Sequence, residues 1–165
     1  MSADFAGDLL RGTEWFARDY AGQRVAILAS GEEAAAILPE VLRTAAQVRL
    51  FEEQPTWVTP VGLPLGPLKR VASKAYLRLA VHDAWTRRQL TPHRRFDSRK
   101  VTVSPSYYSA LQSPRTRLIH WPAYAIVEQG VRTADGVEHR VDVMIIGATS
   151  HFAMAGGDRR EDKIA

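Results

Sequence analysis

Residues 24–51 constrain the fold of this chain more than any other stretch. Residues 24–29 form a compact apolar run that is typical of a buried parallel strand. Ser30 and Gly31 can turn the chain, and residues 32–46 are rich in helix-forming side chains. A second short apolar run follows at residues 48–51. Because two parallel strands need a long crossover, this order predicts a strand–helix–strand unit.

The rest of the chain adds a helical segment and then several short strands. Pro39 is expected to bend or restart the first helix. After a proline-rich connector at residues 56–67, apolar residues at helical spacing predict an amphipathic helix over residues 68–89. Further on, we expect strands at residues 101–103, 118–120 and 124–127, a hairpin at 130–141 that turns at Asp135-Gly136, and a last strand at 142–147.

Together these segments predict an α/β fold. It would be a Rossmann-like parallel sheet with flanking helices, a helical insertion after the second strand and a β-hairpin near the C-terminus. A length of 165 residues, 45% of them hydrophobic and 24% charged, suits one globular domain. We expect that single domain over residues 1–155, with the insertion at 67–90 and a flexible tail at 156–165.

Composition excludes several classes of protein and site. The chain has no cysteine, so it has no disulfides or thiolate metal sites. Its five histidines lack metal-ligand spacing, and we expect no metal site. Its first residues do not resemble a signal peptide, and no apolar run is long enough for a transmembrane segment. These features favour a cytoplasmic protein.

The net charge of +4 comes from one strongly basic segment. Residues 67–100 contain only two aspartates, Asp83 and Asp97, against ten basic residues: Lys69, Arg70, Lys74, Arg78, Arg87, Arg88, Arg94, Arg95, Arg99 and Lys100. Such a segment could face phosphates or an anionic surface, but a solvated helix face and loop is the favoured interpretation. No recognisable nucleic-acid-binding module is present, so nucleic acid is not expected as a partner.

The turn after the first strand partly matches the dinucleotide-binding pattern G-x-G-x-x-G/A. Its residues are Ala29, Ser30, Gly31, Glu32, Glu33 and Ala34. The second and third positions fit, whereas alanine replaces the first glycine. The two glutamates suit the helix dipole, but they compete with a diphosphate for the N–H groups at the start of the helix.

Acidic residues also end the second strand. Glu52 and Glu53, followed by Gln54, lie about twenty residues after the glycine, where a carboxylate can bind a ribose 2′-hydroxyl and repel a 2′-phosphate. This pattern indicates an NADH-like preference with a weakened phosphate cradle. A Rossmann-like fold that binds no nucleotide is an equal alternative. The candidate cofactor-binding residues are Ser30, Gly31, Glu32, Glu33, Ala34, Glu52, Glu53 and Gln54.

Five short motifs occur in a characteristic order. They are Phe5-x-Gly7 with Trp15, the glycine turn with the strand at 48–51, residues 52–57, residues 99–111 with Tyr107-Tyr108, and the hairpin and strand at 130–147. In this order they resemble the NADPH-binding domain of Baeyer–Villiger and related class B flavin monooxygenases over nearly the whole chain. The resemblance implies a fold of the type predicted above, with NAD(P)H as a weakly bound cofactor.

The same comparison locates departures from the family's pattern. Arg11 stands where the family has its signature histidine, and Glu53 where an arginine contacts the 2′-phosphate of NADPH. Lys100 stands in place of the active-site arginine; it keeps the charge but loses the planar fork. Lys100 and Arg11 therefore occupy functional positions of the family, and no catalytic residue is assigned.

The resemblance also implies an FAD domain, whose glycine fingerprint is not found before residue 24. We expect that this chain alone does not bind FAD, and that as a pseudoenzyme-like homologue it lacks monooxygenase activity by itself. Two alternatives remain. One is a non-catalytic scaffold that uses the retained fold to bind a protein partner, and the other is a subunit completed by a separate flavoprotein chain. The sequence does not fix the oligomeric state.

Overall fold

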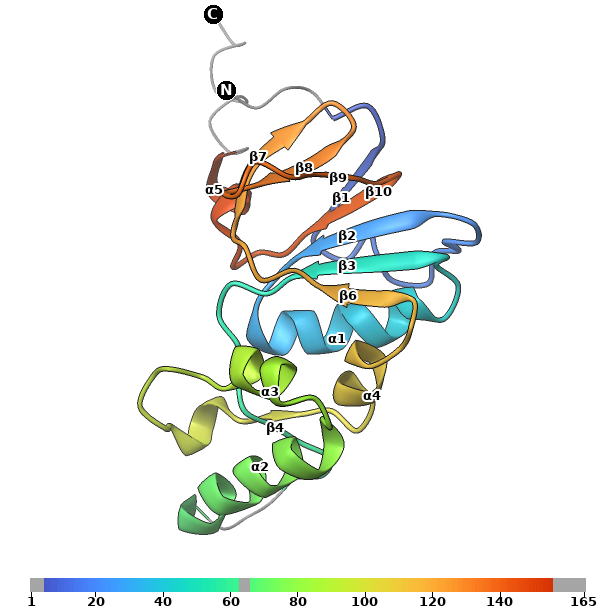
Figure 1. Ribbon diagram of the computed structural model, residues 1–165. Helices are drawn as coiled ribbons and strands as arrows, with labels where there is room; N and C mark the ends of the chain where they lie inside the picture. The colour runs from blue at the N-terminus through green and yellow to red at the C-terminus, as the bar shows by residue number, and fades with distance from the viewer. Residues whose placement is uncertain (1–4, 63–65, 156–165) are drawn as a thin grey trace, which may run out of the picture.

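A five-stranded parallel sheet forms the centre of the protein (Figure 1). The computed structural model describes residues 5–62 and 66–155. Across the sheet the strands follow the order β1 (Asp8–Arg11), β10 (Val143–Ile146), β2 (Arg24–Leu28), β3 (Gln47–Phe51) and β6 (Thr116–Leu118). The predicted parallel sheet is confirmed, and the last predicted strand, β10, pairs with β1 and β2 inside it. The tail predicted for residues 156–165 lies outside the described residues.

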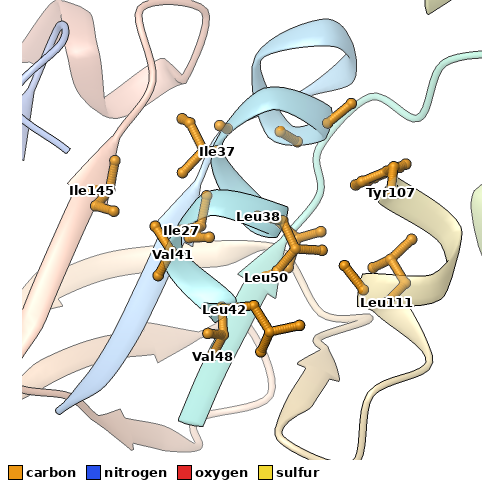
Figure 2. Close-up of a cluster of buried hydrophobic side chains, with 14 of the residues drawn as sticks. Ile27, Ile37, Leu38, Val41, Leu42, Val48, Leu50, Tyr107, Leu111 and Ile145 are labelled. Atoms are coloured by element: carbon orange, nitrogen blue, oxygen red, sulfur yellow. The ribbon is translucent and has the colours of Figure 1, made fainter. Parts of the chain in front are cut away.

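Helix α1 (Gly31–Leu42) covers one face of the sheet and buries the larger apolar cluster (Figures 1 and 2). Ile37, Leu38 and Val41 are fully buried against strand residues such as Ile27 and Leu50. The expected restart of the helix at Pro39 is wrong, because α1 is a single helix with Pro39 inside its last turn. Burial of the apolar residues on either side of Pro39 holds that turn in place despite the missing N–H.

The opposite face is covered by an antiparallel sheet of β7 (Ala123–Val127), β8 (Gly130–Thr133) and β9 (Glu138–Arg140) (Figure 1). The predicted hairpin is confirmed, and Gly136 at its turn has a φ of 85°, a left-handed conformation that favours glycine. Val131 on this sheet and Met144 and Ile146 on β10 belong to a second buried cluster. The parallel sheet is therefore buried on both faces.

The segment between β3 and β6, which we call the insertion from here on, extends beyond α1 (Figure 1) and is longer than the helical insertion predicted at residues 67–90. Its elements are β4 (Val58–Thr59), α2 (Gly66–Ala80), α3 (Ala84–Leu90), the short 3-10 helix η1 (Ser98–Lys100), β5 (Thr102–Val103) and α4 (Tyr107–Leu111). A final helix, α5 (His151–Ala155), follows the parallel sheet. No helix within residues 5–62 and 66–155 is long and apolar enough to span a membrane.

The single helix predicted over residues 68–89 is wrong, because α2 ends at Ala80 and α3 begins at Ala84. Asp83 separates them by capping α3, where its carboxylate accepts a hydrogen bond from the Thr86 N–H at 2.6 Å. The buried side of α2 also differs from the predicted one. Helical spacing predicted burial of Leu68, Val71, Ala72, Ala75, Tyr76 and Leu79, whereas Ser73 and Leu77 are the buried residues. The predicted exposure of the basic residues is confirmed for Arg70, Lys74 and Arg78.

Replacing Leu50 by alanine tests whether the cluster under α1 stabilises the fold. Leu50 is fully buried, so Leu50→Ala should lower the free energy of unfolding by about 2–5 kcal/mol through lost burial and a residual cavity. Leu79 is 76% exposed on α2, and Leu79→Ala should change it by less than about 0.5 kcal/mol. Urea unfolding followed by circular dichroism measures both values. Equal effects would contradict this assignment of the core.

Candidate functional site

The candidate site lies at the carboxyl ends of β2 and β10. The chain leaves β2 through α1 toward β3 on one side, whereas β10 and β1 lie on the other side. In open parallel sheets, ligands bind in the crevice where the strand order reverses in this way. Here that crevice is bordered by Ser30 and Gly31 after β2, and by Gly147 after β10.

The turn after β2 has the geometry of a phosphate-binding turn. Gly31 begins α1 with a φ of 60°, which a residue with a side chain adopts only with strain. Ser30 precedes the helix, but its hydroxyl does not cap it. The Ser30 Oγ is buried and has no hydrogen-bond partner among the described residues. An orphaned hydroxyl beside a helix N-terminus fits a phosphate oxygen.

Glu52 extends from the end of β3 toward the glycine turn. One carboxylate oxygen accepts hydrogen bonds from the Gly31 N–H at 3.2 Å and the Gln54 N–H at 3.1 Å. The other accepts one from the Tyr107 hydroxyl at 3.1 Å. Burial raises the pKa of Glu52 to about 7, although these three hydrogen bonds favour the ionised form. Burial together with Glu52 raises the pKa of Tyr107 well above its ordinary value.

Glu33 closes the other side of the crevice. Its carboxylate accepts hydrogen bonds from the Ala148 N–H at 2.8 Å and the Thr149 hydroxyl at 3.3 Å. At Gly147, an added Cβ would lie 2.7 Å from a Glu33 carboxylate oxygen and 2.8 Å from the Ala29 Cβ. Ala29, which replaces the first glycine of the pattern, therefore fits because Gly147, at the end of β10, has no side chain.

Glu53 faces a different part of the protein from Glu52. Its carboxylate contacts the His151 Nδ1 at 2.6 Å, which ties the end of β3 to α5. It lines a cavity of about 380 Å³ together with Phe51, His120 and Trp121. Glu52 borders the same cavity, so the two carboxylates differ in their hydrogen-bond and ion-pair partners and not in the cavity that they line. The two adjacent glutamates, which the sequence presents as equivalent ribose ligands, therefore have separate roles in the structure.

A cationic cavity of about 230 Å³ opens beside the glycine turn. Ser30, Gly31 and Gln54 line it. Its lining also includes Arg94, Arg95 and Lys100 from the insertion, with Asp97 as the acidic residue among them. Three cations facing a helix N-terminus favour an anionic ligand. The carbonyl of Lys100 is held by a hydrogen bond from the Thr56 hydroxyl at 2.9 Å.

The remaining predicted site residues lie around this cavity rather than in it. Glu32 is exposed and lines a neighbouring groove of about 700 Å³ that it shares with Arg99 and Lys100. Ala34 is fully buried, as the third position of the pattern requires for close packing of helix and strand. Arg11 ends β1 at the same edge of the sheet, but it is not among the residues that line the 230 Å³ cavity.

Sequence reasoning did not assign Tyr107, Arg94 or Arg95 to the site. Tyr107 is buried in the core, and its hydroxyl also holds Glu52. The two arginines carried a signal only as part of the basic segment, and the fold of the insertion brings them to the cavity that Gly31 also lines. Within residues 5–62 and 66–155, no group of three or more metal-ligating side chains comes together.

The homologues of this chain are Baeyer–Villiger and FAD-binding monooxygenases, which confirms the resemblance. An FAD-binding monooxygenase of Aspergillus niger is 23% identical over 87% of this chain and 30% of its own length. A Baeyer–Villiger monooxygenase of Streptomyces coelicolor is 24% identical over 89% and 36%. One from Pseudomonas aeruginosa is 22% identical over 87% and 35%. The chain thus spans about a third of the length of these relatives, and no family model matches it.

Solved structures show the same fold. Cyclohexanone monooxygenase in an open crystal form superposes with a TM-score of 0.77 at 16% identity, over 91% of this chain and 45% of the other. Steroid monooxygenase bound to NADP gives 0.75 at 15% identity, over 87% and 42%. OTEMO in complex with FAD and NADP gives 0.78 at 17% identity, over 93% and 44%. The α/β architecture predicted from the sequence is therefore confirmed.

Glu52 should make the stability of the protein depend on pH. Its pKa is about 7 in the folded protein, above the ordinary 4.5, so the folded state holds the proton more tightly than the unfolded chain. This contribution, at most about 3 kcal/mol, is complete below pH 4.5 and is lost as the pH rises through 7. The free energy of unfolding in urea should fall across this window, and Glu52→Gln should remove that part of the fall. The exposed Glu32→Gln is the control and should retain it; a Glu52→Gln curve parallel to the wild type would contradict the assignment.

Proposed function

We propose that this chain is a homologue of the NAD(P)H-binding domain of a flavin-dependent, Baeyer–Villiger-type monooxygenase that binds its dinucleotide weakly. By itself it would not carry out monooxygenation. The observation that carries the proposal is the hydrogen bond from the Gly31 N–H to the Glu52 carboxylate. This N–H is the group that a diphosphate needs at the start of α1.

A dinucleotide would have to compete with the protein's own carboxylates. Glu52 occupies the N–H of Gly31, and Glu33 occupies the N–H of Ala148 across the crevice. An ionised carboxylate at either place repels a diphosphate, and displacing Glu52 would leave a buried charge without its partners. Competition of this kind lowers affinity without altering the fold.

Other features support residual binding rather than a complete loss. The Ser30 hydroxyl has no partner among the described residues, and Arg94, Arg95 and Lys100 face the glycine turn. These groups fit a phosphate. The bound nicotinamide would supply hydride chemistry, which the residues of this chain would orient rather than perform. Residues that hold FAD are proposed to lie outside the portion shared with the relatives, either in the same protein or in a separate chain.

A second candidate function is a non-catalytic scaffold. The Glu53–His151 contact favours it, because the acidic residue that would bind a ribose instead joins β3 to α5 within the domain. Undetectable dinucleotide binding by a folded protein, even with the Glu52 charge removed, would favour this candidate over the first.

Calorimetric titration with NADH and NADPH at a pH above 8 tests the proposal. The wild type should bind NADH with a Kd of roughly 1 mM, and Glu52→Gln should tighten it about tenfold, which corresponds to ~1.4 kcal/mol. Glu53→Gln is the matched control, since the Glu53 carboxylate contacts His151 and not the Gly31 N–H, and it should change NADH affinity by less than about twofold.

Two results would count against the proposal. Micromolar NADH binding by the wild type would show that the carboxylates do not obstruct the diphosphate. Tighter binding of NADPH than of NADH would contradict the expectation, based on the acidic residues after β3, that a 2′-phosphate is repelled.

A further inference from the structure

Helix α2 lies at the edge of the molecule (Figure 1) and presents aliphatic side chains to the solvent. Leu68, Val71 and Leu79 are 56%, 64% and 76% exposed. The opposite side of the helix carries the buried Ser73 and Leu77 and packs toward β4 and α4. At about 100° per residue, Leu68 and Leu77 lie half a turn apart. Clustered apolar side chains on a surface of this kind mark an interaction site.

The exposed side has the spacing of a helix–helix seam. The α2 seam, as we define it, consists of Leu68, Val71, Ala72, Ala75 and Leu79. Four of these residues are separated by steps of four, three and four, the alternation of a coiled coil. The large side chains lie near the ends and the two alanines lie between them. Alanines at the centre allow the side chains of another helix to approach closely.

Positive charge runs along one side of the α2 seam. Arg70, Lys74 and Arg78 are exposed at intervals of one helical turn. None of the three forms an ion pair with another residue in the described part of the chain. Helix α2 contains no aspartate or glutamate. The surface beside the seam is therefore complementary to acidic side chains.

We propose that the α2 seam docks an amphipathic helix of a partner protein whose Asp and Glu side chains face Arg70, Lys74 and Arg78. The partner's apolar side would cover the exposed aliphatic residues and the central alanines. This surface lies outside the dinucleotide crevice, so the proposal holds whether or not nucleotide binds.

The charges favour such a partner over a second copy of this chain. Two α2 helices packed antiparallel about a two-fold axis would bring their basic sides together, and like charges at that distance repel. An anionic membrane would also attract the basic residues. However, the centre of the seam is alanine, which adds little apolar area for insertion among lipids.

Fluorescence anisotropy with two designed helical peptides tests the proposal on the whole chain. Both peptides carry leucine at their a and d positions; one has glutamate and the other lysine at e and g. At low salt the glutamate peptide should bind at least about tenfold more tightly than the lysine peptide. The difference should shrink in about 0.5 M salt, where charges are screened.

Two sets of variants separate the apolar and charged contributions. Val71→Ser with Leu79→Ser should weaken the glutamate peptide about tenfold, through lost apolar burial. Val137→Ser is the matched control, because Val137 is 48% exposed but lies outside the insertion, between β8 and β9. Arg70→Glu, Lys74→Glu and Arg78→Glu together should reverse the preference between the peptides. All these side chains are exposed, so thermal unfolding should confirm that each variant folds.

Other outcomes would overturn the proposal. Equal affinity for the two peptides, or no effect of the paired serine variants, would remove the α2 seam as a helix-docking site. Binding to vesicles of phosphatidylcholine and phosphatidylglycerol at roughly 7:3, without binding to the glutamate peptide, would assign the surface to a membrane instead. A concentration-dependent dimer that the paired serine variants abolish would assign it to a second copy.

Discussion

The burial of β2 between β10 and β3, beneath α1, is the constraint on which the rest of this structure depends. Its parallel neighbours force the chain to cross the sheet through α1 on one side and to return from a distant segment on the other. The carboxyl ends of these strands therefore meet at one edge. Residues from positions 30, 52 and 147 come together there because backbone pairing aligns the strands, before any side chain contributes.

The side chains at that edge differ from those of a simple phosphate-binding site. Glu52 and Glu33 accept backbone hydrogen bonds from opposite sides of the crevice, and Arg94 and Arg95 approach from the insertion. The site thus combines internal anions at the backbone with cations at its rim. The balance between these opposing charges determines how an anionic ligand competes, and protonation of Glu52 shifts it near neutral pH.

Local sequence patterns correctly predicted several helices, strands and turns. The glycine turn, β2, β3 and the hairpin follow from apolar runs and turn residues that act within a few positions of each other. One error came where distant packing competes with local preference, because packing of α1 on the sheet kept the helix intact through Pro39. Another came from a missed local signal, because Asp83 caps α3 within one turn and divides the predicted helix of the insertion. The buried side of α2 depends on its contacts with β4 and α4, which no periodicity in its own sequence reveals.

The sequence by itself determined the kind of fold and the presence of acidic residues after β3, because strand and turn signals and residue order are local properties. Only the tertiary structure decided that Glu52 turns toward Gly31 while Glu53 turns toward His151. Successive side chains at a strand end point to opposite faces of the sheet, so their partners depend on what covers each face. One face is covered by the insertion, which contributes Tyr107, and the other by α5. Both Tyr107 and α5 lie far from β3 in the sequence.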